Sequence, residues 1–476
     1  MDERIKEIID IPSEDRLTEF KRLGGESRIV SKTIETIVAM ANTEGGQIIL
    51  GVDDPEKSRL KGEKRIFGIE ENKELFDEIG REISRITSPL NNLWPPELIE
   101  YNKEKTIAVI NISKSTDNFH QIDNQVFIRL EKGNKRLTPH EIVKLSYAKG
   151  FSQADKELVD IDVELLNTQS YKNWILNRGI PESDISDVLL NTGLARRNES
   201  NIIKPTAAAV MLFALYPSDL LDTKCEIRIF QYLDKEEKIV SDTLNYSSVP
   251  HTIKGPVIKQ IKDAHDYVLN LLKAGMRIPD SGFINTYTLP ERTVKEAITN
   301  AVIHRDYYIK RPLEIRIFTD RIEVESPGLF PSNITQSNIG KVRAESYRNN
   351  LIVKHLREFP VPPNLDQNEG IKLLRKEMND ANLFPPVFLI NKSSQDSIIL
   401  KLYFGKRNTE WNIISNYLSA KEKYINNEKV RDLLNEPKLY KVSRLLSKWN
   451  DMGILIKLEK IGTKSVRYRL PESFEN

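Results

Sequence analysis

The chain has 476 residues, too many for one ordinary hydrophobic core, so we expect about three folding units. Its 71 Lys and Arg residues almost balance 69 Asp and Glu, which excludes attraction of nucleic acid through overall charge and leaves only local basic patches. Cys225 is the single cysteine, which excludes an internal disulfide framework and is typical of a cytoplasmic protein. We expect no membrane span, because no segment is apolar over the roughly 18 residues that one requires.

The first 150 residues show alternating strand and helix patterns. A strand pattern at 17–23 precedes a helix pattern at 30–41, and the apolar run 48–52 predicts a buried strand ending at Asp53 and Asp54. The other elements expected in this α/β domain are a helix over 73–86, strands over 106–112 and 126–130, and a last helix beginning at a Thr138–Glu141 capping box.

Three segments of this domain resemble the Schlafen-type AlbA domain: SEDRLTEFKRL, AMANTEGGQIILGVDD and VFIRLEKGNKRLTPHEIVKL. In nuclease-active Schlafen proteins, two glutamates of the first motif and an aspartate after the G-V strand form an acidic triad. The resemblance therefore implies that Glu14, Glu19 and Asp54 are catalytic, with Asp53 as the alternative third member.

Three carboxylates that face one point need a cation, and their hard oxygens suit Mg²⁺ or Mn²⁺. Such a metal can activate water against a phosphodiester, with Lys21 and the basic stretch 129–136 contacting the nucleic-acid backbone. The alternative is a site that binds nucleic acid without cutting it, and a basic stretch that is only a solvated hairpin.

The middle of the chain is expected to contain a helical connector over 151–205 and a nucleotide-binding domain over 206–405. The elements expected there are a buried segment over 207–215, a strand over 226–233, a helix over 257–271, and a hairpin of 313–318 and 321–325 with a two-residue loop.

The segment PERTVKEAITNAVIHRDY places Glu296 and Asn300 four residues apart, on one face of a helix. This spacing resembles the E-x-x-x-N box of the GHKL ATPases. The resemblance implies that Asn300 binds the Mg²⁺ on ATP and that Glu296, where hydrolysis occurs, orients the attacking water.

Three further motifs resemble a divergent GHKL subfamily that is fused to Schlafen-type domains. They are the turn Ser326-Pro327-Gly328-Leu329, the segment Arg348-Asn349-Asn350-Leu351-Ile352 and the box Asn368-Glu369-Gly370-Ile371. The usual adenine-binding aspartate is missing, so ATP binding without turnover is the alternative to hydrolysis. The implied cofactor-binding residues are Glu296, Asn300, Asp306, Pro327, Gly328 and Gly370.

Residues 406–476 are expected to form a winged helix-turn-helix. Helix patterns at 411–418, 427–434 and 438–452 precede strand patterns at 454–460 and 465–470. The third helix and the wing have nine basic residues against two acidic ones, a footprint typical of phosphate contacts. The candidate nucleic-acid contacts are Lys21, Lys438, Lys441, Arg444, Lys448 and Lys464. Docking to another protein is the alternative.

These patterns predict an α+β multidomain protein: a Schlafen/AlbA-type α/β domain, a Bergerat-like α/β sandwich and a winged helix. The favoured function is a metal-dependent nuclease for RNA, tRNA or DNA that ATP gates, with a defence role implied by resemblance alone. The alternative is a non-enzymatic, ATP-binding transcriptional regulator, and a third hypothesis is an ATPase that remodels DNA. A homodimer is expected only because GHKL relatives often pair.

Overall fold

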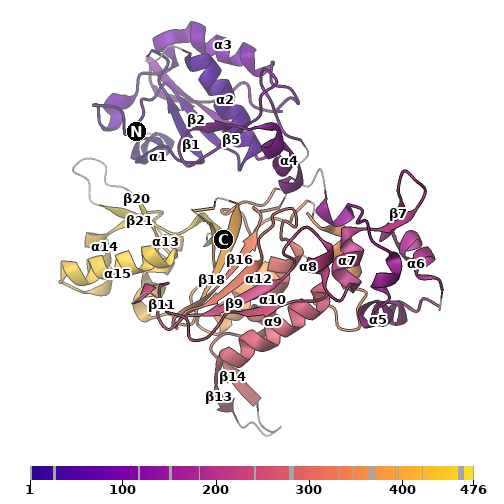
Figure 1. Ribbon diagram of the computed structural model, residues 1–476. Helices are drawn as coiled ribbons and strands as arrows, with labels where there is room; N and C mark the ends of the chain where they lie inside the picture. The colour runs from indigo at the N-terminus through magenta and orange to yellow at the C-terminus, as the bar shows by residue number, and fades with distance from the viewer. Residues whose placement is uncertain are drawn as a thin grey trace. The chain divides into compact units, whose positions relative to one another are not determined.

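Contacts in the computed structural model divide the chain into two units, which are described separately. Unit 1 comprises Met1–Phe151 and Ile413–Leu470, and unit 2 comprises Ser152–Asn412 and Pro471–Asn476 (Figure 1). No helix in the described part of the chain is long and apolar enough to cross a membrane. The described residues are 3–24, 28–115, 118–149, 153–181, 183–237, 239–240, 243–277, 284–331, 333–345, 347–363, 370–391, 393–394, 396–420, 422–458 and 466–474.

The first part of unit 1 is built on a sheet with the strand order β1-β2-β4-β3. Its first two strands run parallel, with Glu19 beside Ile48 and Lys21 beside Leu50, and the other pairs are antiparallel. The strands are β1 (Thr18–Lys21), β2 (Gly46–Leu50), β3 (Glu97–Asn102) and β4 (Lys105–Ile112). The parallel pairing brings the ends of β1 and β2 to one edge, so the residues after each strand become neighbours.

Both faces of this sheet are covered by apolar side chains. Ile48 and Leu50 pack with helices α2 (Ile29–Asn42) and α3 (Lys73–Ile83), whereas Ile49 packs on the other face with α1 (Glu3–Asp10). This alternation follows from the two-residue period of a strand and explains why β2 is a continuous apolar run.

The remaining elements of unit 1 agree with the expected order. The Thr138–Glu141 capping box is confirmed at the start of α4. A C-terminal sheet of order β19-β21-β20 accompanies three helices, and Arg467 of β21 pairs with Asp10 at 2.7 Å. The elements are β5 (Phe127–Arg129), β6 (Asn134–Arg136), α4 (Pro139–Ala148), α13 (Thr409–Ala420), β19 (Ile425–Asn426), α14 (Asn427–Leu434), α15 (Leu439–Met452), β20 (Ile456–Leu458) and β21 (Arg467–Arg469).

Unit 2 is built on a sheet of order β12-β9-β15-β16-β18-β17, in which only β9 and β15 pair in parallel. Helix α10 packs on β16 and against α9 and α12 (Figure 1). The strands are β9 (Ile227–Gln231), β12 (His251–Ile253), β15 (Leu313–Ile317), β16 (Arg321–Pro327), β17 (Val387–Ile390) and β18 (Ser397–Tyr403), and these helices are α9 (Val257–Leu271), α10 (Glu291–Ile303) and α12 (Gly370–Asp380).

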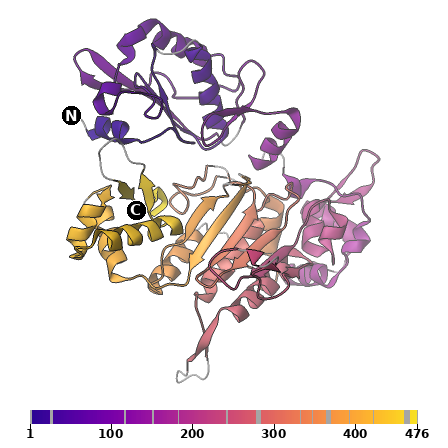
Figure 2. The same ribbon diagram turned by 60° about the vertical axis from the view of Figure 1, so that its left-hand side comes forward.

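Unit 2 also contains smaller elements outside this sheet. The expected connector contains helices and also a hairpin, and the β13–β14 hairpin projects from the unit in both views (Figures 1 and 2). These elements are α5 (Gln169–Arg178), α6 (Ile185–Thr192), β7 (Ala195–Arg197), β8 (Ile203–Pro205), α7 (Ala207–Phe213), α8 (Pro217–Leu220), β10 (Ile239–Val240), β11 (Thr243–Leu244), β13 (Lys273–Arg277), β14 (Ile284–Tyr287) and α11 (Asn350–Leu356). Short 3-10 helices cover 62–65, 69–72, 154–156, 163–166 and 472–474.

Glycine is required at position 328, directly after β16, by the backbone conformation and by the neighbouring side chains. Its φ is +110°, and a Cβ there would lie 2.5 Å from Arg348 Nη1. Gly179 has a φ of +65°, and a Cβ there would meet nothing within 4 Å.

We expect Gly328→Ala to lower the free energy of unfolding of unit 2 by about 3 kcal/mol, against about 1 kcal/mol for Gly179→Ala. Hydrogen exchange of the β16 amides in urea measures both, and equal losses would contradict the steric argument.

Candidate functional site

The three acidic residues predicted in unit 1 lie near one another and are buried. Glu19 is on β1, and Glu14 folds back over that strand because its Oε1 accepts a hydrogen bond from Phe20 N–H at 2.9 Å. Asp54 follows β2 and accepts from Glu56 N–H at 2.9 Å. The parallel β1–β2 pairing therefore assembles the acidic cluster, defined here as Glu14, Glu19 and Asp54.

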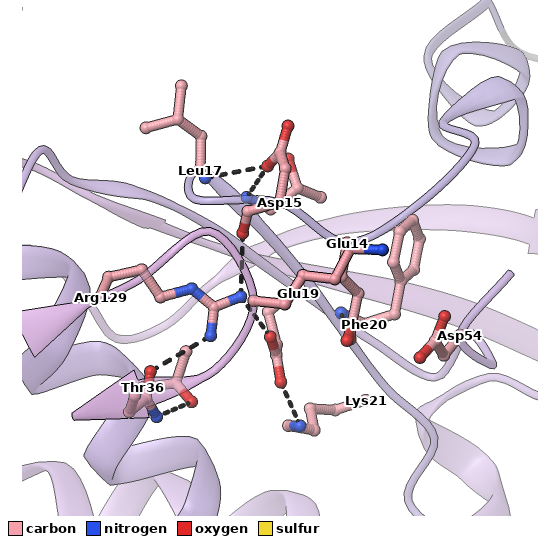
Figure 3. A network of polar contacts seen from close by, with 12 residues as sticks. Glu14, Asp15, Leu17, Glu19, Phe20, Lys21, Thr36, Asp54 and Arg129 are labelled. Atoms are coloured by element: carbon pink, nitrogen blue, oxygen red, sulfur yellow. Dashed lines mark hydrogen bonds and ion pairs between the residues drawn. The ribbon is translucent and has the colours of Figure 1, made fainter. Parts of the chain in front are cut away.

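Each carboxylate of the acidic cluster faces a cation. Arg129 Nη2 donates to Glu19 Oε2 at 2.5 Å, and Lys21 donates to the other oxygen of Glu19 (Figure 3). The Lys57 ammonium lies 3.0 Å from Asp54 Oδ2 and 3.7 Å from Glu14 Oε2. The negative charge of the cluster is thus balanced by the protein itself.

The acidic residues differ in how readily they ionise. Burial, and then the charge of Glu19, raises the pKa of Glu14. Burial also acts against ionisation of Asp54, but the hydrogen bonds from Glu56 N–H and from Lys57 outweigh it and lower the pKa of Asp54. A positive charge entering the cluster is therefore most needed beside Glu14.

The expected Mg²⁺ or Mn²⁺ site is not formed by this arrangement. Among the residues that the structure describes, no three His, Cys, Asp or Glu side chains gather as a metal-binding group. Cations of the chain occupy the positions beside the carboxylates that a metal would need, so the acidic cluster as it stands does not fit a metal ion.

The basic stretch 129–136 has a structural part and an exposed part. Arg129 is only 1% exposed and donates to Glu19, to Asp15 O and to Asn134 Oδ1, so it supports the cluster from inside. Lys132 pairs with Glu56 at 2.7 Å. Sequence reasoning missed the role of Arg129, although its two-residue spacing from the buried Phe127 was a signal that its side chain points inward.

Unit 2 contains a cavity of about 780 Å³ between α10, the end of β16 and the start of α12. Four of the six predicted cofactor-binding residues line it: Glu296, Asn300, Gly328 and Gly370. Much of the wall is apolar and comes from segments that sequence reasoning did not single out, including Phe330, Ile334, Ile339, Phe388 and Leu400.

Glu296 and Asn300 interact directly, since Asn300 Nδ2 donates to Glu296 Oε1 at 2.8 Å. Burial raises the pKa of Glu296. A Cβ at Gly370 would lie 1.6 Å from Glu296 Oε1, so a side chain at the start of α12 would displace the Glu296 carboxylate from its present position. The first turn of α12 thus lies against the E-x-x-x-N box.

Two predicted cofactor residues, Asp306 and Pro327, do not line the cavity. Asp306 N–H donates to Pro327 O at 2.7 Å, and Asp306 Oδ1 accepts from Tyr308 N–H at 3.0 Å. Asp306 and Pro327 are both buried and shape the turn behind Gly328. Asn368 and Glu369 lie outside the described residues.

Sequence reasoning missed five polar residues of the cavity: Glu291, Arg292, Lys295, His304 and Tyr347. Two of them had a signal in helical spacing, because Arg292 precedes Glu296 by four residues and His304 follows Asn300 by four.

Helix α15 has an exposed basic face. Lys441, Arg444 and Lys448 are exposed at positions that share one side of the helix, and Lys441 pairs with Glu436 at 2.9 Å. Lys438 is the exposed N-cap residue of α15, and Lys464 lies outside the described residues.

Comparisons with known proteins agree with the resemblances in the sequence. Residues 14–138 match the family "Schlafen, AlbA_2", and residues 310–400 match the family "Putative ATP-dependent DNA helicase recG C-terminal". The chain therefore carries a Schlafen AlbA_2 domain and an ATPase-like domain of the RecG C-terminal type. This combination is that of a nucleic-acid-related, ATP-binding protein.

Two solved structures are similar to the chain at low identity. The DIP2311 protein from Corynebacterium diphtheriae is 16% identical with a TM-score of 0.42, covering 96% of this chain and 92% of that one. The N-terminal domain of a RecG-related protein from Nitrosomonas europaea is 19% identical with a TM-score of 0.19, covering 28% and 90%. No curated protein matches.

The burial of Arg129 predicts an unequal effect of two basic substitutions. Arg129→Ala leaves Glu19 buried and short of one cation, so we expect a loss of about 3 kcal/mol or more in the stability of unit 1. Lys132→Ala removes an exposed ion pair and should cost less than about 1 kcal/mol. Urea unfolding followed by hydrogen exchange of the β1 amides tests this, and a small loss for Arg129→Ala would show that the buried pair is dispensable.

Proposed function

We propose that the protein is an ATP-responsive nucleic-acid protein whose nucleotide binds in the cavity of unit 2. The observation that carries this proposal is the meeting of Glu296, Asn300, Gly328 and Gly370 around one space of about 780 Å³. Ligand pockets of this size with apolar walls and a few convergent polar groups are typical of small-molecule sites.

Basic side chains and backbone N–H groups at one end of the cavity could donate hydrogen bonds to a phosphate-bearing ligand. Arg292 and Lys295 both line the cavity, and Arg292 lies one helical turn before Glu296 on the same helix face. The start of α12 contributes backbone N–H groups and the positive end of its helix dipole, which favour an anion. We assign the phosphates of the nucleotide to this end.

Isothermal titration of the full chain tests the assignment. We expect the double variant Arg292→Ala, Lys295→Ala to bind ATP at least about 10-fold more weakly, because charge-assisted hydrogen bonds contribute roughly 1.5–3 kcal/mol each, and to bind adenosine unchanged. Asn300→Ala should also weaken the binding of ATP. The control is Lys262→Ala, an exposed charge on α9. Loss of ATP and adenosine binding in equal measure would show that these cations do not contact phosphate.

For unit 1, a nuclease and a regulator each have a supporting observation. The nuclease is favoured by the gathering of Glu14, Glu19 and Asp54 beside Lys21 and Lys57. The regulator is favoured by the balance of charge in that cluster, which leaves no metal-binding group among the described residues. In both cases the exposed basic face of α15, within the proposed winged helix, supplies nucleic-acid contacts.

Cleavage assays separate the two functions. Labelled tRNA, single-stranded RNA and duplex DNA are incubated with the full chain, with Mg²⁺ or Mn²⁺ and with or without ATP. The nuclease predicts cleavage that falls at least about 100-fold in Glu19→Gln and Asp54→Asn but not in Glu56→Gln, an exposed acid that pairs with Lys132. Retention of duplex DNA without cleavage would leave the regulator, and dependence on ATP would reveal gating.

A further inference from the structure

His304 is a cavity residue with an unusual environment. It is the C-cap of α10, and its ring lies parallel to Tyr347 at 5.7 Å between centroids and 20° between planes. Both rings line the cavity. Arg348 fixes the backbone of His304, because its Nη1 donates to His304 O at 2.8 Å.

The imidazole of His304 is held neutral. Burial, and then the positive charge of Arg348, lowers the pKa of His304 to about 4. Nδ1 is buried, and within the described part of the chain it has no hydrogen-bond partner. A neutral imidazole has one N–H and one lone pair.

The proton belongs on Nε2 of His304. Buried N–H groups without an acceptor are rarer than buried acceptors without a donor, so a lone pair is the better state for Nδ1. The guanidinium of Arg348 nearby also favours a lone pair there. His304 is then a neutral ring with a single N–H donor, positioned to serve a neutral acceptor in the cavity.

We infer that His304 recognises the base of the nucleotide by donating from Nε2 to a ring nitrogen of a purine. This assignment rests on the proposed function and adds the specificity-determining residue. Gly328, Phe330 and Tyr347 surround this end of the cavity and suit a flat heteroaromatic ring. Arg292 lies 12 residues earlier along the helix, about 18 Å away at the rise of an α-helix, so base and phosphates occupy different ends.

This assignment changes which atoms of the purine the cavity recognises. An aspartate at an adenine site accepts a hydrogen bond from the exocyclic amino group, and no such aspartate follows β16 here. A histidine N–H group instead donates a hydrogen bond to a ring nitrogen of the purine. The structure therefore assigns recognition to an acceptor of the purine ring and not to its amino group.

Binding of deaza nucleotides tests this assignment without any activity assay. The affinities of the full chain for ATP and for its 1-deaza, 3-deaza and 7-deaza analogues are compared by isothermal titration. In the wild type we expect one analogue to bind about 3- to 10-fold more weakly, because it lacks the acceptor for His304. In His304→Phe, ATP and that analogue should bind equally, since the ring remains but its donor is gone.

His304→Gln is the conservative variant, because its amide supplies an N–H donor, and it should restore part of the preference for ATP. Retention of the preference for ATP over adenosine in His304→Phe shows that this variant is folded and still binds phosphate. The same analogue penalty in wild type and His304→Phe, or no penalty in wild type, overturns the role of His304. Absence of ATP binding by the wild type overturns the proposed function itself.

Discussion

The cavity of unit 2 depends on how the end of α10 is capped by two adjacent side chains. Asn349 Nδ2 donates to Ile303 O at 2.9 Å and to Arg305 O at 2.7 Å. Arg348 donates to His304 O and, at 3.0 Å, to Leu329 O. The last carbonyls of a helix have no partners within the helix, so these bonds satisfy them and also tie α10 to the turn after β16. The Arg348-Asn349 motif thereby fixes Asn300 relative to Gly328.

The burial of Arg348 explains why this link is specific. Burial lowers the pKa of its guanidinium, and the charge of Asp306 acts in the opposite direction. The carbonyls of His304 and Leu329 accept from different nitrogens of the planar Arg348 guanidinium, a geometry that the single ammonium of lysine lacks. Gly328 must lack a side chain because Arg348 Nη1 occupies that space. The absence of a side chain at Gly328 and the position of Arg348 therefore depend on each other.

Sequence patterns predicted the elements whose apolar residues repeat regularly and missed those with weaker repeats. Strand β3 is an edge strand with only a short alternation, because Ile99 is buried and Tyr101 half-buried while Leu98 is exposed. Helix spacing identified Glu296 and Asn300 because their pairing is local. The Arg129–Glu19 pair spans 110 residues, and most of the apolar wall of the cavity comes from segments far from α10. Only tertiary structure could bring these together.

The two ends of the acidic cluster respond differently to an incoming cation. Arg129 is buried and holds Glu19 through a contact that cannot open without leaving a buried charge. Lys57 is 71% exposed at its side chain, and exposed ion pairs contribute little to stability. Lys57 can therefore leave Glu14 and Asp54 at small cost, which would open their side of the cluster to another cation, whereas Glu19 stays where it is. Any chemistry in unit 1 is expected to begin at the Glu14–Asp54 side.

Positive and negative side chains also balance at the proposed phosphate end of the unit 2 cavity, as they do in the acidic cluster. Arg292 and Lys295 face Glu291 and Glu296 around it, so the protein offers no net positive charge to a polyphosphate. Asn300 already donates to Glu296, and burial raises the pKa of that carboxyl. Entry of a triphosphate raises this pKa further, since like charges disfavour ionisation. Binding must then be accompanied by a cation or by a proton on Glu296, and a protonated Glu296 cannot accept a proton from water. Proton uptake would favour a nucleotide sensor, and cation uptake would leave hydrolysis open to Glu296.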